Sequence, residues 1–164
     1  MIIDIVIIAA IILFDQLIKL AAAGVLSQLP NQTFVFIPGF ANFSYVQNSG
    51  AAFSMFSNGT LILTILSIAL TAVLFFVLFK TRKYKSMLLR LSLCFIIGGA
   101  IGNIIDRLAF GYVRDMINFT FVKFAVFNVA DSFVSIGAVL LAIFLIFYWD
   151  KVKKRQMLED KHHE

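Results

Sequence analysis

The sequence predicts an all-α membrane protein, a four-transmembrane-helix bundle with a small β-sheet lying as a cradle against the outer membrane surface. Of its 164 residues, 61% are hydrophobic and only 14% are charged. A soluble domain of this size carries nearly twice that share of charge. The apolar residues form four runs, each long enough to cross a bilayer as a helix. We therefore expect a single membrane-embedded domain over residues 1–164.

The first apolar run covers residues 2–23 and would span roughly 33 Å as a helix. Asp15, Gln16 and Lys19 interrupt it. A cleaved signal peptide needs an unbroken apolar centre and a basic start, so we favour a helix that is retained. Three further runs predict the remaining spans, at 60–79, 87–107 and 127–149.

The segment between the first two spans, residues 24–59, contains no charged residue. Within it, Thr33–Ile37 and Phe40–Val46 are rich in aromatic and β-branched side chains, which favours two short strands. An ordinary connecting loop would carry more charge, so we expect a small sheet at the membrane surface, serving as a platform over a substrate. Residues 108–126 are expected to form a loop of mixed character.

The distribution of Lys and Arg predicts the orientation in the membrane. Five lie at 80–90 and five in the tail at 150–164, whereas 24–59 has none and 108–126 has two. Because cytoplasmic segments carry the excess of cations, we place 80–86, 150–164 and both termini in the cytoplasm. The net charge of +5 therefore reflects topology and does not indicate a nucleic-acid partner.

With this orientation, four acids from separate parts of the chain reach one depth near the outer interface. They are Asp15, Asp106, Asp115 and Asp131. Spans joined by a short connection are neighbours, so the last three should lie close together. Ionisable groups are expensive inside a bilayer, and their presence there indicates a functional site.

The residue types present narrow the chemistry of such a site. Both histidines, His162 and His163, lie in the polar tail, and the single cysteine, Cys94, lies in an apolar run where we expect it to pack. These positions argue against a zinc site and against Ser-His or Cys-His nucleophiles, so no metal or cofactor is expected. Two close carboxylates can instead share a proton, one acting as general base on a water and the other as general acid.

Two other interpretations of the acids remain open at this stage. They could pair with Arg107, Arg114 and Lys19 and only hold the bundle together, an interpretation strongest for Asp106 because Arg107 follows it. A small transporter or proton relay could also use membrane carboxylates. That class predicts acids distributed across the bilayer and often an inverted repeat, and no such repeat is visible here.

Five short motifs occur in order along the chain. Asp15-Gln16 with Lys19 comes first and Asn48–Phe53 second, followed by Gly98–Arg107, Gly111–Asp115 and Phe127–Ser132. Together they resemble the bacterial lipoprotein signal peptidases (signal peptidase II, aspartic peptidase family A8) over nearly the whole chain. Ile18 and Met116 replace the more usual Thr and Phe, which bears at most on packing or inhibitor fit.

The resemblance implies an aspartic endopeptidase of the bacterial cytoplasmic membrane. Such enzymes remove signal peptides from diacylglyceryl-modified prolipoproteins, cutting before the lipidated cysteine. The family's catalytic pair falls on Asp115 and Asp131. Its substrate-binding and site-shaping residues fall on Asp15, Lys19, Asn48, Gly50, Asn103, Asp106, Arg107 and Asn128. The expected partners are prolipoprotein substrates and membrane lipids, and we expect a monomer.

Overall fold

The computed structural model describes residues 2–50 and 59–161. Its helices are α1 (Ile2–Leu26), α2 (Gly59–Lys80), α3 (Met87–Phe110), α4 (Val129–Phe147) and α5 (Trp149–Lys161). Its strands are β1 (Thr33–Ile37), β2 (Ala41–Asn48) and β3 (Val113–Phe119), and short 3-10 turns occur at Pro30–Gln32 (η1) and Thr81–Tyr84 (η2). Helices α1 to α4 are long and apolar enough to cross a membrane. The predicted fold class is thus confirmed.

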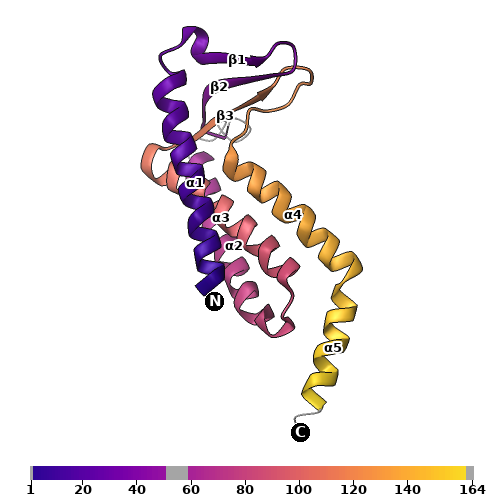
Figure 1. Cartoon of the computed structure of the whole chain (residues 1–164). Helices are drawn as coiled ribbons and strands as arrows, with labels where there is room; N and C mark the ends of the chain where they lie inside the picture. Colours follow the sequence, from indigo (N-terminus) through magenta and orange to yellow (C-terminus); the bar gives the residue numbers. More distant parts are fainter. Residues whose placement is uncertain (1, 51–58, 162–164) are drawn as a thin grey trace.

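Figure 1 shows the sheet at one end of the long helices, with the first and last described residues toward the opposite end. Helix α3 packs against α1, α2 and α4. Glycines allow this close packing, because a Cβ added at Gly98 would lie 2.9 Å from Ile11 of α1, and one at Gly137 of α4 would lie 2.8 Å from the Ser92 carbonyl. Small residues at such crossings let membrane helices approach closely.

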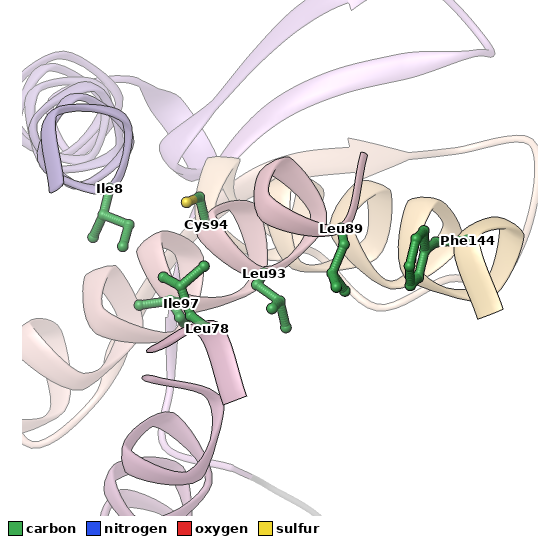
Figure 2. Close-up of a cluster of buried hydrophobic side chains, with 7 residues drawn as sticks. All are labelled: Ile8, Leu78, Leu89, Leu93, Cys94, Ile97 and Phe144. Carbon is green, nitrogen blue, oxygen red and sulfur yellow. The ribbon is translucent and has the colours of Figure 1, made fainter. Parts of the chain in front are cut away.

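A cluster of buried apolar side chains holds the bundle together away from the sheet. Figure 2 shows its seven fully or nearly fully buried members, Ile8, Leu78, Leu89, Leu93, Cys94, Ile97 and Phe144. Cys94 is buried there, as its apolar surroundings in the sequence predict. Four helices contribute to this cluster, so it fixes their mutual positions.

The three strands form one antiparallel sheet in the order β1-β2-β3. Strand β1 has the predicted bounds, and β2 is shifted by one to two residues from the prediction. Strand β3, however, lies in the segment expected to be a mixed loop. Its first four residues, Val113 to Met116, are all buried, so they show no alternation of polar and apolar residues that could have revealed a strand.

Two helix ends differ from the expected spans for identifiable reasons. Helix α3 continues to Phe110 and stops at Gly111, whose φ of +80° suits a glycine cap. Helix α4 begins at Val129 because Asn128 caps it. The tail, expected only to be polar, forms α5. This helix is held by Trp149, whose ring lies 5.3 Å from that of Tyr84 and 6.2 Å from that of Phe144.

Candidate active site

The centre of the candidate site is Asp115, in the middle of β3 and only 1% exposed. Strand β3 pairs with β2, which places Val46 opposite Asp115 and Asn48 two residues further along. The Nδ2 group of Asn48 donates to Asp115 Oδ2 at 2.9 Å. The Oδ1 atom of Asn48 accepts from the Gly50 backbone at 2.9 Å, and Gly50 has a φ of +78° that favours glycine. This turn therefore orients the Asn48 amide toward the carboxylate.

The second aspartate, Asp131, lies in the first turn of α4. Asn128 is the N-cap of this helix, and its Oδ1 accepts from the Asp131 backbone N–H at 2.9 Å. In return, Asp131 Oδ2 accepts from the Asn128 backbone N–H at 3.1 Å. This reciprocal pair is a capping box. The Nδ2 group of Asn128 also donates to Asp115 Oδ1 at 2.6 Å, so one buried asparagine contacts both aspartates.

Asn103 of α3 connects the aspartates to α1. Its Nδ2 donates to Asp131 Oδ1 at 2.8 Å. Its Oδ1 accepts from Asn128 Nδ2 at 3.1 Å and from Lys19 Nζ at 2.8 Å. Because Lys19 can only donate, it determines which way the Asn103 amide points.

Next to the aspartates lies a buried ionic cluster, which consists of Asp15, Lys19, Asp106 and Arg114. Lys19 Nζ is 2.9 Å from Asp15 and 3.5 Å from Asp106. Arg114 binds Asp106 through Nη2 at 2.7 Å, through Nε at 3.2 Å and through its backbone N–H at 2.9 Å. The remaining oxygen of Asp15 accepts from the Ala130 backbone N–H at 2.9 Å, at the start of α4. The cluster thus joins α1, α3, β3 and α4.

Arg107, the residue after Asp106, does not take part in this ionic cluster. It is half-buried, and among the described residues it makes neither a hydrogen bond nor an ion pair. The acids whose charges act on it are Asp131, Asp115 and Asp106, in decreasing order. Asp106 does bind cations that hold the bundle together, as one interpretation of the sequence expects, but these cations are Arg114 and Lys19 and not the adjacent Arg107.

The environment of Asp115 favours its protonated form. Burial raises the pKa of Asp115 from 3.8 to about 6, and the nearby charge of Asp131 acts in the same direction. Hydrogen bonds from Asn48 and Asn128 oppose this rise. A carboxyl with a pKa near neutrality can both hold and release a proton under working conditions.

Two cavities lie on different sides of β3. A cavity of about 240 Å³ is lined by Val46, Gln47, Asn48, Ser49, Asp115, Ala125 and Val126. Asp115 and its partner Asn48 are thus both part of the wall of this cavity. A larger groove of about 480 Å³ is lined by apolar residues of α1 and of the three strands, together with Leu29 and Val129. Met116, next to Asp115, faces that groove, so the larger space does not contain the carboxylates.

The sequence profile of signal peptidase II (Peptidase A8) matches residues 7–147. The chain belongs to this family. It is 46% identical to the lipoprotein signal peptidase of Lactobacillus gasseri over 115 residues, covering 70% of this chain and 74% of that protein. It is 42% identical to the one from Caldanaerobacter subterraneus subsp. tengcongensis over 143 residues, covering 87% and 95%.

A solved structure of a bacterial membrane enzyme, obtained by the in meso method at 1.9 Å resolution, has the same fold with a TM-score of 0.77. The two chains are 28% identical, and the match covers 88% of this chain and 93% of the other. The protein is thus a multi-pass bacterial membrane enzyme of the signal peptidase II family, which consists of aspartic peptidases.

The fold brings together the residues that the signal peptidase II motifs single out, apart from part of the second motif. Ala51, Ala52 and Phe53 lie outside the described residues. Sequence reasoning named Arg114 as a possible partner of the acids but not its link to Gln16, and it missed the role of Gln16. Gln16 donates to Asp15 and Asp106, each at 3.2 Å, and accepts from Arg114 at 2.8 Å. A polar residue beside Asp15, and an arginine between Val113 and Asp115, were the available signals.

Proposed function

We propose that Asp115 and Asp131 are the catalytic pair with which this chain cleaves signal peptides from prolipoproteins. The observation that carries this proposal is the double contact of Asn128. It donates its side-chain amide to Asp115 at 2.6 Å and its backbone N–H to Asp131 at 3.1 Å. A buried asparagine that binds both carboxylates sets their separation and their relative orientation.

Hydrolysis of a peptide bond needs one group that takes a proton and one that supplies it. In the proposed reaction, the ionised carboxylate accepts a proton from a water, whose oxygen adds to the scissile carbonyl carbon. The protonated partner donates to the carbonyl oxygen, giving a neutral tetrahedral intermediate. The pair then passes its proton to the leaving nitrogen. As the carbon–nitrogen bond breaks, one hydroxyl of the intermediate gives its proton to the pair, which again holds one proton.

The surrounding polar groups serve this reaction by positioning it. Lys19 orients Asn103, and Asn103 orients Asp131. Asn48, held by the turn at Gly50, orients Asp115 from the opposite side. Arg107 is the cation left to act on the pair or on a substrate carbonyl. Asp15 and Asp106 shape the site through the ionic cluster rather than by contact with the scissile bond.

The substrate proposed is a prolipoprotein already carrying a diacylglyceryl group, cut on the N-terminal side of the lipidated cysteine. The sheet supports this, because it exposes large apolar side chains beside the site. Phe34, Phe36 and Phe40 are each about half exposed, as are Phe121 and Phe124 beyond β3. Aromatic side chains suit the membrane interface, where a lipidated segment would present its bond.

We further propose that the sheet end of the bundle faces the outside and that both termini are cytoplasmic, as the distribution of Lys and Arg predicts. We also propose that the enzyme is a monomer surrounded by membrane lipids. Light scattering on the purified enzyme measures the number of chains. Cysteine labelling of single-cysteine variants in intact cells measures the orientation.

The aspartate pair is tested by replacing each member without changing its shape. Asp115→Asn and Asp131→Asn are each expected to abolish release of the mature form from a diacylglyceryl-prolipoprotein in detergent, measured on a gel. Asp150→Asn is the control, since Asp150 is exposed in the first turn of α5, beyond the far end of α4, and it should cleave at the wild-type rate. Substantial cleavage by either active-site variant, with the protein folded, would remove that residue from the pair.

A further inference from the structure

The buried ionic cluster is electrically balanced without help from its neighbours. It contains the two acids Asp15 and Asp106 and the two cations Lys19 and Arg114. Each acid has a cation within hydrogen-bonding distance, Lys19 at 2.9 Å from Asp15 and Arg114 at 2.7 Å from Asp106. An unpaired charge at such depth is costly, and pairing removes that cost.

The group next to it is not balanced in the same way. Asp115 and Asp131 carry two negative charges when both are ionised, and Arg107 adds one positive charge near them. One further positive charge, a single proton, makes this group neutral. A proton shared by two carboxylates is the state that the proposed hydrolysis requires.

Arg114 is the main partner of the Asp106 carboxylate. Its guanidinium and its backbone N–H reach both carboxylate oxygens, and the same Nη2 group donates to Gln16 at 2.8 Å. The guanidinium also lies 4.7 Å from the ring centre of Phe110. Lys19 already lies 3.5 Å from Asp106, so it is the cation placed to replace Arg114 if Arg114 were removed.

We propose that Arg114 is a positioning residue that neutralises Asp106, so that Lys19 stays on Asn103 beside the Asp115–Asp131 pair and this pair keeps one shared proton. The inference rests on the proposed function, because it explains how the catalytic pair keeps its charge state. Arg114 also fixes the pair mechanically. It ties β3 to α3 and α1 at the position directly before Asp115.

Removal of the Arg114 charge would leave Asp106 without its main partner. Asp106 would then draw Lys19 away from Asp15 and Asn103, and the catalytic pair would lose positive charge nearby. Carboxyl groups that lose a neighbouring cation bind protons more tightly. The acidic limb of the pH–rate profile should therefore move to higher pH.

The groups that set this profile come from each described element packed around the pair. Helix α4 contributes Asp131, α3 contributes Arg107 and Asp106, and α1 contributes Lys19 and Asp15. Strand β2 presents Tyr45 to Arg114 and the neutral amide of Asn48 to Asp115. Among the described residues, the Arg114 side chain has no hydrogen bond or ion pair with either aspartate of the pair, so its replacement tests charge balance rather than direct contact.

The experiment compares kcat and KM across pH for cleavage of a diacylglyceryl-prolipoprotein in detergent by four variants. Arg114→Met removes the charge, and Arg114→Lys keeps it but loses the planar fork. The double variant Arg114→Met with Asp106→Asn removes both members of the ion pair. Arg90→Met is the matched control, because Arg90 binds Asp4 at 2.7 Å in the same way at the opposite end of the bundle.

We expect Arg114→Met to move the acidic limb upward by about one pH unit and to lower kcat about tenfold near that limb, with KM little changed. Arg114→Lys should keep the wild-type limb. The double variant should regain most of the lost kcat and the wild-type limb, although it carries one more substitution. Arg90→Met should lower the melting temperature and leave the profile unchanged.

A double variant no better than Arg114→Met, or an Arg114→Met profile identical to that of Arg90→Met, would overturn the inference. If Arg114→Met does not fold, the pH limbs of Arg114→Lys and of the double variant still decide it, since a shift in either contradicts charge balance. Failure of the proposed function has a different signature. It would appear as cleavage by Asp115→Asn or Asp131→Asn, whatever the Arg114 variants do.

Discussion

Replacement of Asn128 tests whether the two aspartates act as one unit. Asn128 is fully buried and does two separable things. Its Oδ1 caps α4 at the Asp131 backbone N–H, at 2.9 Å, and its Nδ2 donates to Asp115, at 2.6 Å. Asn128→Ala removes both interactions. Asn128→Ser keeps a capping oxygen, because serine is as good an N-cap as asparagine, but loses the amide donor.

The magnitudes follow from these two interactions. Loss of the cap costs about 1 kcal/mol of the free energy of unfolding, and loss of a hydrogen bond to a charged group costs about 2 kcal/mol. Asn128→Ala should thus lose about 3 kcal/mol and Asn128→Ser about 2 kcal/mol. For a chain of this length, 1 kcal/mol corresponds to roughly 3 °C, so melting temperatures should fall by about 9 °C and about 6 °C.

Activity should separate from stability in this pair of variants. Both lose the donor that opposes the rise of the Asp115 pKa, so both should cleave at least about tenfold more slowly near neutral pH, with the acidic limb at higher pH. The assays are thermal unfolding in detergent and gel-based cleavage of lipidated substrate. Near-normal cleavage by Asn128→Ser would refute the reasoning, because Asn128 would then act only as a helix cap.

Three further predictions concern other parts of the molecule. Burial raises the pKa of Asp115 to about 6, so the stability due to its protonated form is present below about pH 4 and is lost as the pH rises through about 6. Over this range the melting temperature of Asp115→Asn should therefore rise relative to that of the wild type. A constant difference between the two melting temperatures would contradict the assignment. Gly102→Ala would place a Cβ 2.5 Å from Asp15 Oδ2 and should cost about 1–3 kcal/mol, whereas Gly24→Ala, with nothing within 4 Å, should be neutral or stabilising in an unfolding assay. Phe40 is 45% exposed and stacks on Phe121 at 4.7 Å. Phe40→Lys should impair processing in membranes more than in detergent, whereas Phe40→Leu should not. Equal processing by these two variants would argue against a membrane-facing sheet.

The four spans could be predicted because a bilayer restricts the composition of each segment that crosses it. Lipid offers no hydrogen-bond partners, so a crossing segment must be helical and apolar over about twenty residues. Strand β3 could not be predicted in this way. Arg114 and Asp115 are both buried in it. Arg114 binds Asp106 of the ionic cluster, and Asp115 accepts hydrogen bonds from Asn48 and Asn128. A strand buried on both faces with charged residues inside it has the composition of a surface loop.

The acids show the same limit at the level of single contacts. Their number, their common depth and the motifs around them follow from the order of residues and the direction of each span. Which cation each acid binds does not. Asp106 lies next to Arg107 in the chain, yet it binds Arg114, eight residues away, because the turn at Gly111 brings β3 back against the end of α3.

The sequence by itself determined the class of protein, the four crossings, the family and the identity of the candidate acids, since hydrophobicity and short motifs are properties of neighbouring residues. Only the tertiary structure decided how charge is shared among those acids. The pairing of Arg114 with Asp106, the freedom of Arg107 from ion pairs within the described residues, and the double contact of Asn128 depend on distances between segments far apart in the chain. Burial makes the free energy depend strongly on those distances, because a carboxylate away from water must either pair with a cation or bind a proton.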